Sequence, residues 1–529
     1  MTENPDAVLE RLSTIVEEAT RSTREGVKYF IEPAPGVLQR ALTKRHHIIF
    51  GRRGSGKSSL LRKLETDASR DRRPVVYVDM EQFKAHSYPD VLVSVLIRTM
   101  NGFVDWLTTT AVTPSSNKKF WSRIIQSLPS RSAINRSKAE ALRGRINAVR
   151  LELECLLHEG EKVNLKTTHL TRDQASLDLQ SNISLSAKTP IVSAGATGRT
   201  SQKQSESTSL SVQQQYTSKK IEFLQRSVLR FKELVSDVAL LSNSHGYIVL
   251  DDLYHIRTSD QADVIDYFHK VCKDTNIWLK IGTLRHRTRY YIPGDPPRGM
   301  KLSDDADAID LDVTLEKYAT TKKFLRKIIE QFTVEAGARL DDTITDGAID
   351  RLVLACGGVA RDFLTIFRRS IDICRERNAR GNVKGGGKIT TEDVNVASGA
   401  HDSTKREEFS TDTATTDQSA LLNVFGKVSS FCLDDSKANC FLVEKDYRGR
   451  DKTAIDELVD LKFLHKVSSR VTVSTRVNRI YEAFMLDLSQ YAGERARRNF
   501  EILKFWEADS EDLLRKTGLI LLENKKTEA

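Results

Sequence analysis

The chain has 529 residues, of which 39% are hydrophobic and 29% are charged, and its formal net charge is +10. This ordinary composition and length predict two to four domains. The sequence contains no run of about 18 apolar residues, so we expect no membrane span. The first residues lack the basic and apolar regions of a signal peptide, and the six cysteines have no C-x-x-C spacing. We therefore expect a cytoplasmic protein with reduced thiols, without a zinc site or a disulfide framework.

Residues 1–30 are predicted to form an N-terminal helix. Apolar side chains such as Leu9, Leu12 and Val16 recur there at helical spacing, with charged residues between them. Pro33 then interrupts the pattern. We interpret this helix as a simple packing element.

A phosphate-binding loop is predicted between a buried strand at residues 45–50 and a helix at residues 59–68. Residues 51–58 fit the pattern G-x-x-x-x-G-K-[ST], in which glycines let backbone N–H groups face phosphate oxygens. In this pattern Lys57 reaches the β- and γ-phosphates and the Ser58 hydroxyl ligates Mg²⁺. The residues expected to contact ATP are Gly51, Arg52, Arg53, Gly54, Ser55, Gly56, Lys57, Ser58 and Ser59.

A second buried strand is predicted at residues 74–80, followed by a helix at residues 88–112. A strand, a loop with its helix and another strand indicate an α/β sheet. Asp79 falls at the carboxyl end of this strand, where open α/β sheets place ligands. It is either a polar switch that touches Asp252 or an ordinary turn residue.

Residues 113–245 are too long for an ordinary connection and are interpreted as an insertion. Two basic helices are expected first, at residues 117–128 and 133–158. The polar segment of residues 165–212 is expected to be flexible, with a β-ribbon as the alternative. A third helix, at residues 213–242, returns to the sheet, so the insertion resembles a projecting arm.

The positive charge of the chain gathers in this insertion. Residues 117–150 hold nine basic side chains and one acidic side chain, a net charge of +8, whereas residues 405–529 hold 21 basic and 22 acidic side chains. The basic stretch is either a solvated face or a contact for an anion or an acidic partner. The residues proposed for contact with nucleic acid or a partner are Arg136, Lys138, Arg143 and Arg145.

Residues 246–252 read as a buried strand that ends in two carboxylates. Asp251 is expected to hold Mg²⁺, directly or through water. Asp252 is expected to orient or deprotonate the attacking water. In the absence of a phosphate-binding loop, the same pair would be interpreted as a solvated turn.

The next strand, residues 277–283, ends at Thr283, a candidate sensor near the γ-phosphate. A cationic stretch follows, from which one residue is a candidate arginine finger toward a neighbouring subunit. Its members are Arg285, Arg287, Arg289, Arg298 and Lys301. A loop that binds nothing is the alternative interpretation.

Residues 31–311 are thus predicted to form an ATPase core, and residues 312–400 an all-helical lid. Within the lid, Arg361 lies in the first turn of a helix that follows two glycines. A cation there is unfavourable for the helix dipole, so a role outside the helix, such as phosphate binding, is plausible.

Residues 401–418 are polar and Thr-rich and are predicted to form a linker. Residues 419–492 show the order helix, strand, helix, strand, strand, which suits a small winged-helix domain. Residues 493–529 are predicted to form an amphipathic helical tail.

Together these motifs resemble those of AAA+ ATPases of the origin-recognition/Cdc6 type, and more closely their bacterial relatives. The resemblance covers roughly residues 30–400 without the insertion, and it implies an α/β P-loop core with a helical lid and Mg²⁺-ATP at their junction. It carries the Walker A, Walker B and sensor roles to Lys57, Ser58, Asp251, Asp252, Thr283 and Arg361. Asp252 stands where glutamate is usual and Thr283 where asparagine is commoner, and the first difference is expected to slow hydrolysis.

Two functions remain open at this stage. The first is a nucleotide-driven switch that acts on double-stranded DNA and assembles with its own copies when ATP is bound. The second is a signalling or anti-phage ATPase of the STAND type, because the Asp-Asp strand end is also similar to those proteins. The second would act through a separate protein effector, since the chain has no nuclease, protease or deaminase motif. A transposition-type regulator that loads on DNA as a filament is a weaker third option.

Overall fold

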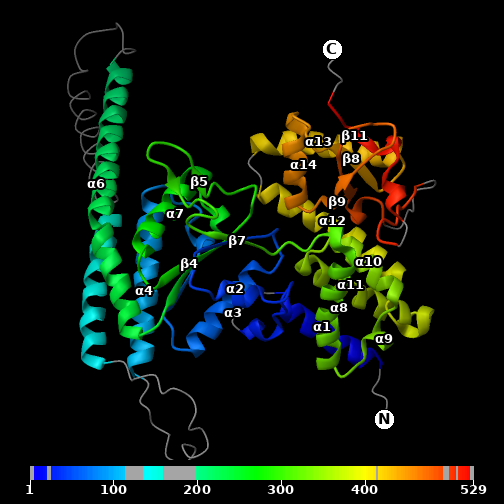
Figure 1. The fold of residues 1–529 in the computed structure, drawn as a ribbon, viewed down its shortest axis with the longest axis horizontal. Helices are drawn as coiled ribbons and strands as arrows, with labels where there is room; N and C mark the ends of the chain where they lie inside the picture. The colour runs from blue at the N-terminus through cyan, green and yellow to red at the C-terminus, as the bar shows by residue number, and fades with distance from the viewer. Residues whose placement is uncertain are drawn as a thin grey trace, which may run out of the picture.

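The computed structural model describes residues 5–20, 25–112, 135–158, 197–412, 415–492, 500–507 and 510–524. The predicted helix at residues 117–128 and most of the predicted flexible segment lie outside these residues. Figure 1 shows a core carrying a long helical insertion on one side and a helical lid and C-terminal unit on the other.

A five-stranded parallel sheet organises the first half of the chain. Its strand order is β2-β3-β4-β1-β7, so the strand before the phosphate-binding loop is separated from the Asp-Asp strand by β4. The α/β class predicted from the sequence is therefore confirmed. The strands are β1 (His47–Phe50), β2 (Val75–Asp79), β3 (Gly246–Asp251), β4 (Ile277–Thr283) and β7 (Asp307–Asp310).

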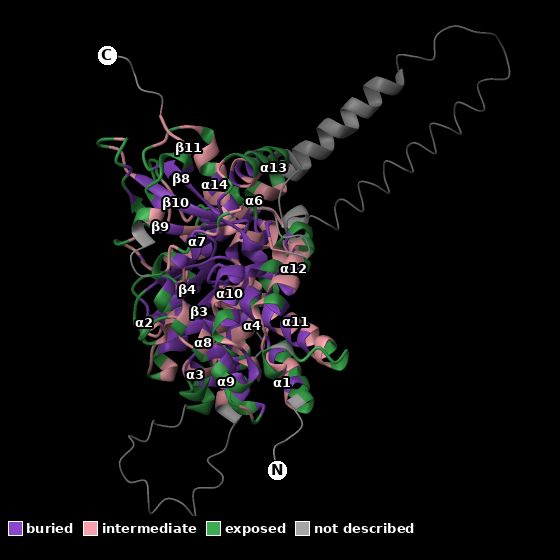
Figure 2. Cartoon of the chain, turned by 90° about the vertical axis from the view of Figure 1, so that its right-hand side faces the viewer, coloured by how far each residue is buried: buried purple, intermediate pink, exposed green. Residues whose placement is uncertain are grey.

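Helices cover both faces of the sheet, as an almost continuously apolar set of strands requires. One face packs against α3 (Lys57–Arg70) and the short α2 (Val37–Ala41). The other packs against α4 (Asp90–Val112) and α7 (Thr258–Cys272). Figure 2 shows buried residues concentrated on the strands and the inner sides of the helices. A hairpin of β5 (Tyr291–Ile292) and β6 (Arg298–Gly299) follows β4.

The insertion contributes two long helices, one at residues 136–158 and α6 (Thr197–Ser242), which begins earlier than predicted. Figure 1 places α6 beside α4 at the outer side of the core. The two helices are part of the core, because their inner faces share a hydrophobic cluster with α4. The cluster includes Leu142, Ile146, Val149, Phe231, Leu234 and Val238.

One helix among the described residues is long and apolar enough to cross a membrane. It lies within α4, over Asp90–Thr110, and 61% of its most apolar window is buried inside the protein. Such burial is typical of a core helix and agrees with the prediction that the chain has no membrane span.

The lid packs as a helical bundle, with the N-terminal helix α1 (Pro5–Ala19) joined to its core. Arg375 of the lid pairs with Asp6 of α1 at 2.7 Å. A one-turn helix at Glu25–Tyr29 connects α1 to the sheet. The lid helices are α8 (Tyr318–Glu335), α9 (Leu340–Thr343), α10 (Asp346–Cys356), α11 (Ala360–Ala379) and α12 (Thr391–Asp412).

The C-terminal unit has its elements in the predicted order, and its four-stranded sheet has the order β11-β8-β10-β9. The winged-helix assignment of this unit stays a prediction. Its elements are α13 (Thr415–Ser430), β8 (Cys440–Glu444), α14 (Arg450–Asp460), β9 (Leu464–Val471), β10 (Tyr481–Leu486) and β11 (Ile520–Leu522).

Three sequence-based expectations differ from the structure. The predicted linker is largely helical, because α12 continues to Asp412 and buries Lys405 against Asp487 at 2.6 Å. The predicted helical tail instead supplies β11, which extends the edge of β8, together with short 3₁₀ turns. Finally, no strand was predicted at β7, because its four residues include two aspartates and lack a clear apolar run.

Candidate nucleotide-binding site

The phosphate-binding loop has the geometry that its glycines allow. Gly54 and Gly56 have φ angles of 87° and 96°, in the left-handed region that side chains rarely adopt. Gly56 is the N-cap residue of α3, so the loop ends where unpaired helix N–H groups begin. A phosphate group would meet these N–H groups and the positive end of the helix dipole.

Lys57 is 4% exposed, and its Nζ atom donates hydrogen bonds to carbonyl oxygens of the loop itself. The distances are 2.7 Å to Gly51 O and 3.1 Å to Arg52 O. Burial lowers the pKa of Lys57, whereas the nearby charges of Asp252 and Asp251 oppose that shift. The loop therefore holds the ammonium group between its own backbone and the two carboxylates.

The two carboxylates at the end of β3 have different environments. Asp251 is 2% exposed, and its Oδ1 atom accepts a hydrogen bond of 3.0 Å from the backbone N–H of Asp252. Asp252 has a φ of 55°, and its side chain lines a pocket beside the loop. Burial and the charge of Asp251 raise the pKa of Asp252 to about 7, while Lys57 opposes the shift. A carboxyl group with such a pKa suits proton transfer near neutral pH.

That pocket occupies about 790 Å³, open solvent included, and lies between the loop, the end of β3 and the lid. It brings Lys57, Ser58, Asp252 and Arg361 together, as the sequence predicted. Its other polar lining residues are Thr20, Arg53, Ser59, Glu81, Tyr254 and His255.

The lid touches the loop through the backbone. The N–H group of Arg361 donates to the carbonyl oxygen of Gly54 at 3.2 Å. A Cβ atom on Gly54 would lie 2.8 Å from the Cβ of Arg361, so this approach requires glycine. Any group that enters the pocket therefore lies against both the loop and the first turn of α11.

Arg52 makes a second connection that the sequence did not reveal. Its guanidinium is buried and donates to the carbonyl oxygens of Val313 at 3.0 Å and Gly357 at 2.9 Å. Its backbone N–H donates to Asp312 Oδ1 at 2.8 Å. The side chain thus fastens the loop to the lid, and contact of Arg52 with the nucleotide stays a prediction.

Thr283 and Asp79 do not line the pocket. Thr283 is fully buried beside the end of β1, and its hydroxyl shares a 2.5 Å hydrogen bond with Thr288. Asp79 accepts a 3.0 Å hydrogen bond from the N–H of Glu81 and caps a 3₁₀ turn, as a turn residue would. The sensor role of Thr283 stays a prediction.

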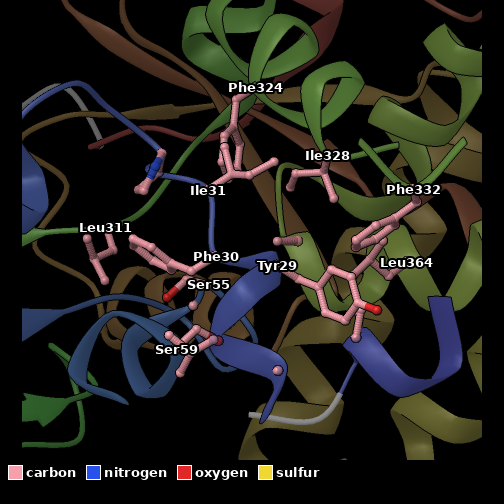
Figure 3. Close-up of a pocket in the computed structure, with 16 residues that line it drawn as sticks. Tyr29, Phe30, Ile31, Ser55, Ser59, Leu311, Phe324, Ile328, Phe332 and Leu364 are labelled. Atoms are coloured by element: carbon pink, nitrogen blue, oxygen red, sulfur yellow. The ribbon is translucent and has the colours of Figure 1, made fainter. Parts of the chain in front are cut away.

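A second, largely apolar pocket of about 700 Å³ adjoins the loop on its other side. Figure 3 shows Ser55 and Ser59 of the loop on one side and lid side chains on the other, with Tyr29 and Phe30 between them. The lid side chains are Phe324, Ile328, Phe332 and Leu364. The apolar lining suits a flat apolar group attached to phosphates held by the loop.

The basic side chains predicted for partner contact divide into two pairs. Arg136 pairs with Glu140 at 3.1 Å and Arg145 with Asp237 at 2.6 Å. Lys138 and Arg143 are exposed, and the described part of the chain offers neither of them an ion pair. These two residues keep the most unbalanced charge on the helix at residues 136–158.

The basic residues of the cationic stretch after β4 also differ in whether they form ion pairs. Four of its members have acidic neighbours: Arg285 pairs with Asp310, Arg287 with Glu457, Arg298 with Asp263 and Lys301 with Asp304. Arg289 is exposed, and within the described ranges its side chain forms no ion pair.

No protein-family model matches the sequence, and no curated protein matches it. Among solved structures, the chain is similar to a Walker-type ATPase of Pyrococcus abyssi, at 10% identity and a TM-score of 0.38, over 86% of this chain and 92% of that one. It is also similar to the Aeropyrum pernix ORC1 protein in complex with DNA, at 13% identity and a TM-score of 0.34, over 87% of this chain and 91% of that one. Likenesses of this strength carry no argument about function.

The chain's own features indicate its fold. The phosphate-binding loop joins β1 to α3, the acidic residues end β3, and a helical lid places Arg361 at the pocket between them. The chain has an α/β P-loop fold with a helical lid, an arrangement that fits the fold of AAA+ ATPases. The resemblance to the origin-recognition/Cdc6 type rests on the same motifs in the same chain order.

Proposed function

We propose that the chain is a Mg²⁺-ATP-binding ATPase that works as a nucleotide-driven switch. The observation that carries this proposal is the pocket where the loop, the Asp-Asp strand end and the lid meet. The lid approaches the loop through the contacts of Arg361 and Arg52. A nucleotide bound in this pocket therefore acts on the position of the lid.

The residues present fit ATP and magnesium. Among the residues that the structure describes, the buried hydroxyl of Ser55 finds no hydrogen-bond partner, as a group reserved for a ligand would. Ser58 and Asp251 offer the oxygen ligands that magnesium prefers. When bound, magnesium neutralises charge on the phosphates. Lys57 and the N–H groups of α3 bind the phosphates, and Asp252 orients the attacking water and accepts its proton.

The finer part of the proposal is that this switch acts on DNA through the basic helix at residues 136–158. The exposed Lys138 and Arg143 form no ion pair within the described residues, so each can displace a counterion from a phosphate. Arg136 and Arg145 would first have to leave Glu140 and Asp237.

A second candidate is an ATPase that signals to a protein effector. It is favoured by α14, the helix between β8 and β9, which carries four acidic and two basic residues. Glu457 of α14 lies 3.9 Å from Arg287 of the core, so part of the helix faces the protein itself. Such a helix is poorly suited to a DNA groove, and a C-terminal unit of this charge fits a protein partner better.

The decisive experiment measures ATPase rates with and without double-stranded DNA at two salt concentrations. Wild type is compared with Lys57→Ala and Asp252→Ala, which we expect to lose ATP binding and hydrolysis respectively. Lys138→Ala/Arg143→Ala should abolish stimulation by DNA, whereas Lys323→Ala/Lys327→Ala, which removes two exposed lysines from the lid, should not. A rate indifferent to DNA in wild type would refute the DNA role and support the signalling candidate.

Assembly with further copies of the chain in the presence of ATP is the last part of the proposal. It is supported by Arg289, an exposed cation on the loop that follows β4 and is available to a neighbouring subunit's phosphates. Sedimentation with a non-hydrolysable ATP analogue, with ADP and without nucleotide tests it. A single species under all three conditions would exclude assembly at that concentration.

A further inference from the structure

Tyr77 connects β2 to the acidic end of β3. In the register of the two strands, Tyr77 pairs with Val249 and Asp79 pairs with Asp251. The Tyr77 hydroxyl therefore lies within reach of the Asp251 carboxylate, and it donates a hydrogen bond to the Oδ2 atom. The ring is covered on the α3 side by Arg62, whose guanidinium carbon lies 3.4 Å from the ring centroid.

The Asp251 carboxylate is held from three directions. Tyr77 donates to Oδ2, and the N–H group of Asp252 donates to Oδ1 at 3.0 Å. On the third side, Gly282 of β4 lies so close that a Cβ atom there would be 2.5 Å from Oδ1 and 2.9 Å from Leu61. Each oxygen of this buried carboxylate thus has one fixed donor, and each keeps acceptor capacity for one further partner.

Tyr77 acts as a donor in this contact. A carboxylate only accepts hydrogen bonds, so the O–H group of Tyr77 is the donor to the Oδ2 atom of Asp251. Magnesium prefers carboxylate oxygens and water. A neutral phenol therefore influences a metal at this site through Asp251 and not as a ligand.

We propose that Tyr77 is a positioning residue that fixes the orientation of the magnesium-holding carboxylate of Asp251. The inference rests on the proposed function, because it assumes that Asp251 serves magnesium and ATP. Hydrogen-bond partners of metal-binding groups commonly change metal affinity by roughly 10- to 100-fold when they are removed. In this chain the hydroxyl of Tyr77 is the hydrogen-bond partner of Asp251, and Arg62 packs on the Tyr77 ring and keeps the ring in position.

A purely structural role is the competing explanation, since a half-buried hydroxyl also needs a partner. Tyr247 provides the matched control. It lies near the opposite end of β3, and its hydroxyl donates to the carbonyl oxygen of Leu42 at 2.6 Å. The same hydroxyl also contacts His245 Nε2 at 2.9 Å and the Arg73 guanidinium at 3.5 Å. Tyr247→Phe removes the hydroxyl of another tyrosine in the same sheet without touching Asp251.

The test titrates Mg²⁺ against binding of a fluorescent non-hydrolysable ATP analogue to the full-length protein. For Tyr77→Phe we expect unchanged affinity in EDTA and a Mg²⁺ midpoint about 10-fold higher than in wild type. Tyr247→Phe should keep the wild-type midpoint. In the Asp251→Asn background, Tyr77→Phe should cause no further shift, because the two residues act through one contact.

The inference is overturned if Tyr77→Phe keeps a Mg²⁺ midpoint within twofold of wild type, or if Tyr247→Phe shifts it equally. A parallel thermal-unfolding measurement gives the stability that each phenylalanine variant loses. We expect Tyr247→Phe to lose at least as much as Tyr77→Phe, because its hydroxyl has more partners. If the proposed function itself is wrong, the result differs from both of these outcomes. The wild-type protein would then bind the ATP analogue without any dependence on Mg²⁺.

Discussion

The ion pair between Asp362 and Lys462 is expected to be a main attachment of the C-terminal unit to the lid. Lys462 Nζ lies 3.0 Å from Asp362 Oδ1, and the two residues are 4% and 2% exposed. Asp362 follows Arg361 in the first turn of α11, while Lys462 follows α14. We predict that Lys462→Met loosens the C-terminal unit and leaves the central sheet intact.

The magnitude follows from leaving a buried carboxylate without its partner. Burial by itself raises the pKa of Asp362, but Lys462, His401 and Lys405 together hold that pKa well below its ordinary value. Removal of one member of a buried pair typically costs about 3–5 kcal/mol. The lower end applies here, because His401 lies 3.8 Å from the same oxygen and remains after the change.

Hydrogen exchange read by mass spectrometry measures this effect element by element. A loss of about 3 kcal/mol corresponds to faster exchange by roughly 100-fold, because each 1.4 kcal/mol is a factor of ten. We expect that increase in β9 and β10, with β3 unchanged. Lys466→Met is the matched control: Lys466 is 30% exposed, and its partner Glu482 also pairs with Lys452, so the expected cost is below about 1 kcal/mol. Equal exchange in the two variants would refute the reasoning.

Three further predictions concern the site and the sheet. Gly282→Ala should abolish Mg²⁺-dependent ATP hydrolysis in a folded protein, because the added methyl group displaces Asp251; circular dichroism and an ATPase assay check both parts. His46 and His47 are buried, and burial lowers the pKa of each from 6.5 to about 3. The stability that these two neutral histidines contribute is therefore complete above pH 6.5 and is lost as the pH falls toward 3. The free energy of unfolding should fall by up to about 1.4 kcal/mol per pH unit for each histidine. Urea unfolding between pH 7 and 4.5 measures this loss. Arg289→Ala should lower the ATPase rate of the assembled protein while leaving binding of the ATP analogue unchanged, and equal rates would exclude a finger role.

The sequence predicted the parts of the site whose chemistry is local. A loop that wraps phosphates needs its glycines, lysine and serine at fixed spacing, so residues 51–58 could be recognised without the fold. The end of β3 was recognisable only in combination with that loop, because two carboxylates after an apolar run otherwise suit a solvated turn. Arg361 was marked by its unfavourable position in a helix, and the structure places it at the pocket.

The features that the sequence did not predict depend on residues that lie far apart in the chain. Tyr77 reads as an ordinary strand residue, and only the pairing of β2 with β3 brings it to Asp251. Lys405 lies in a polar stretch that suits a linker, yet Asp487, 82 residues later, accepts its hydrogen bond and buries it. The apolar residues of β11 pair with the edge of β8 and extend the sheet. The prediction of a helical tail considered only the local pattern and could not include this distant strand.

Gly357 of the lid contacts both the loop and the C-terminal unit. Its carbonyl oxygen accepts a hydrogen bond from Arg52 of the loop, while its Cα faces the ring of His465, leaving no room for a side chain. His465 is in turn bonded to Asp487 at 2.7 Å inside the C-terminal unit. A nucleotide that displaces Arg52 therefore removes a contact from the residue against which the C-terminal unit packs. Because a close-packed contact of this kind cannot deform gradually, the loop and the C-terminal unit are expected to change state together.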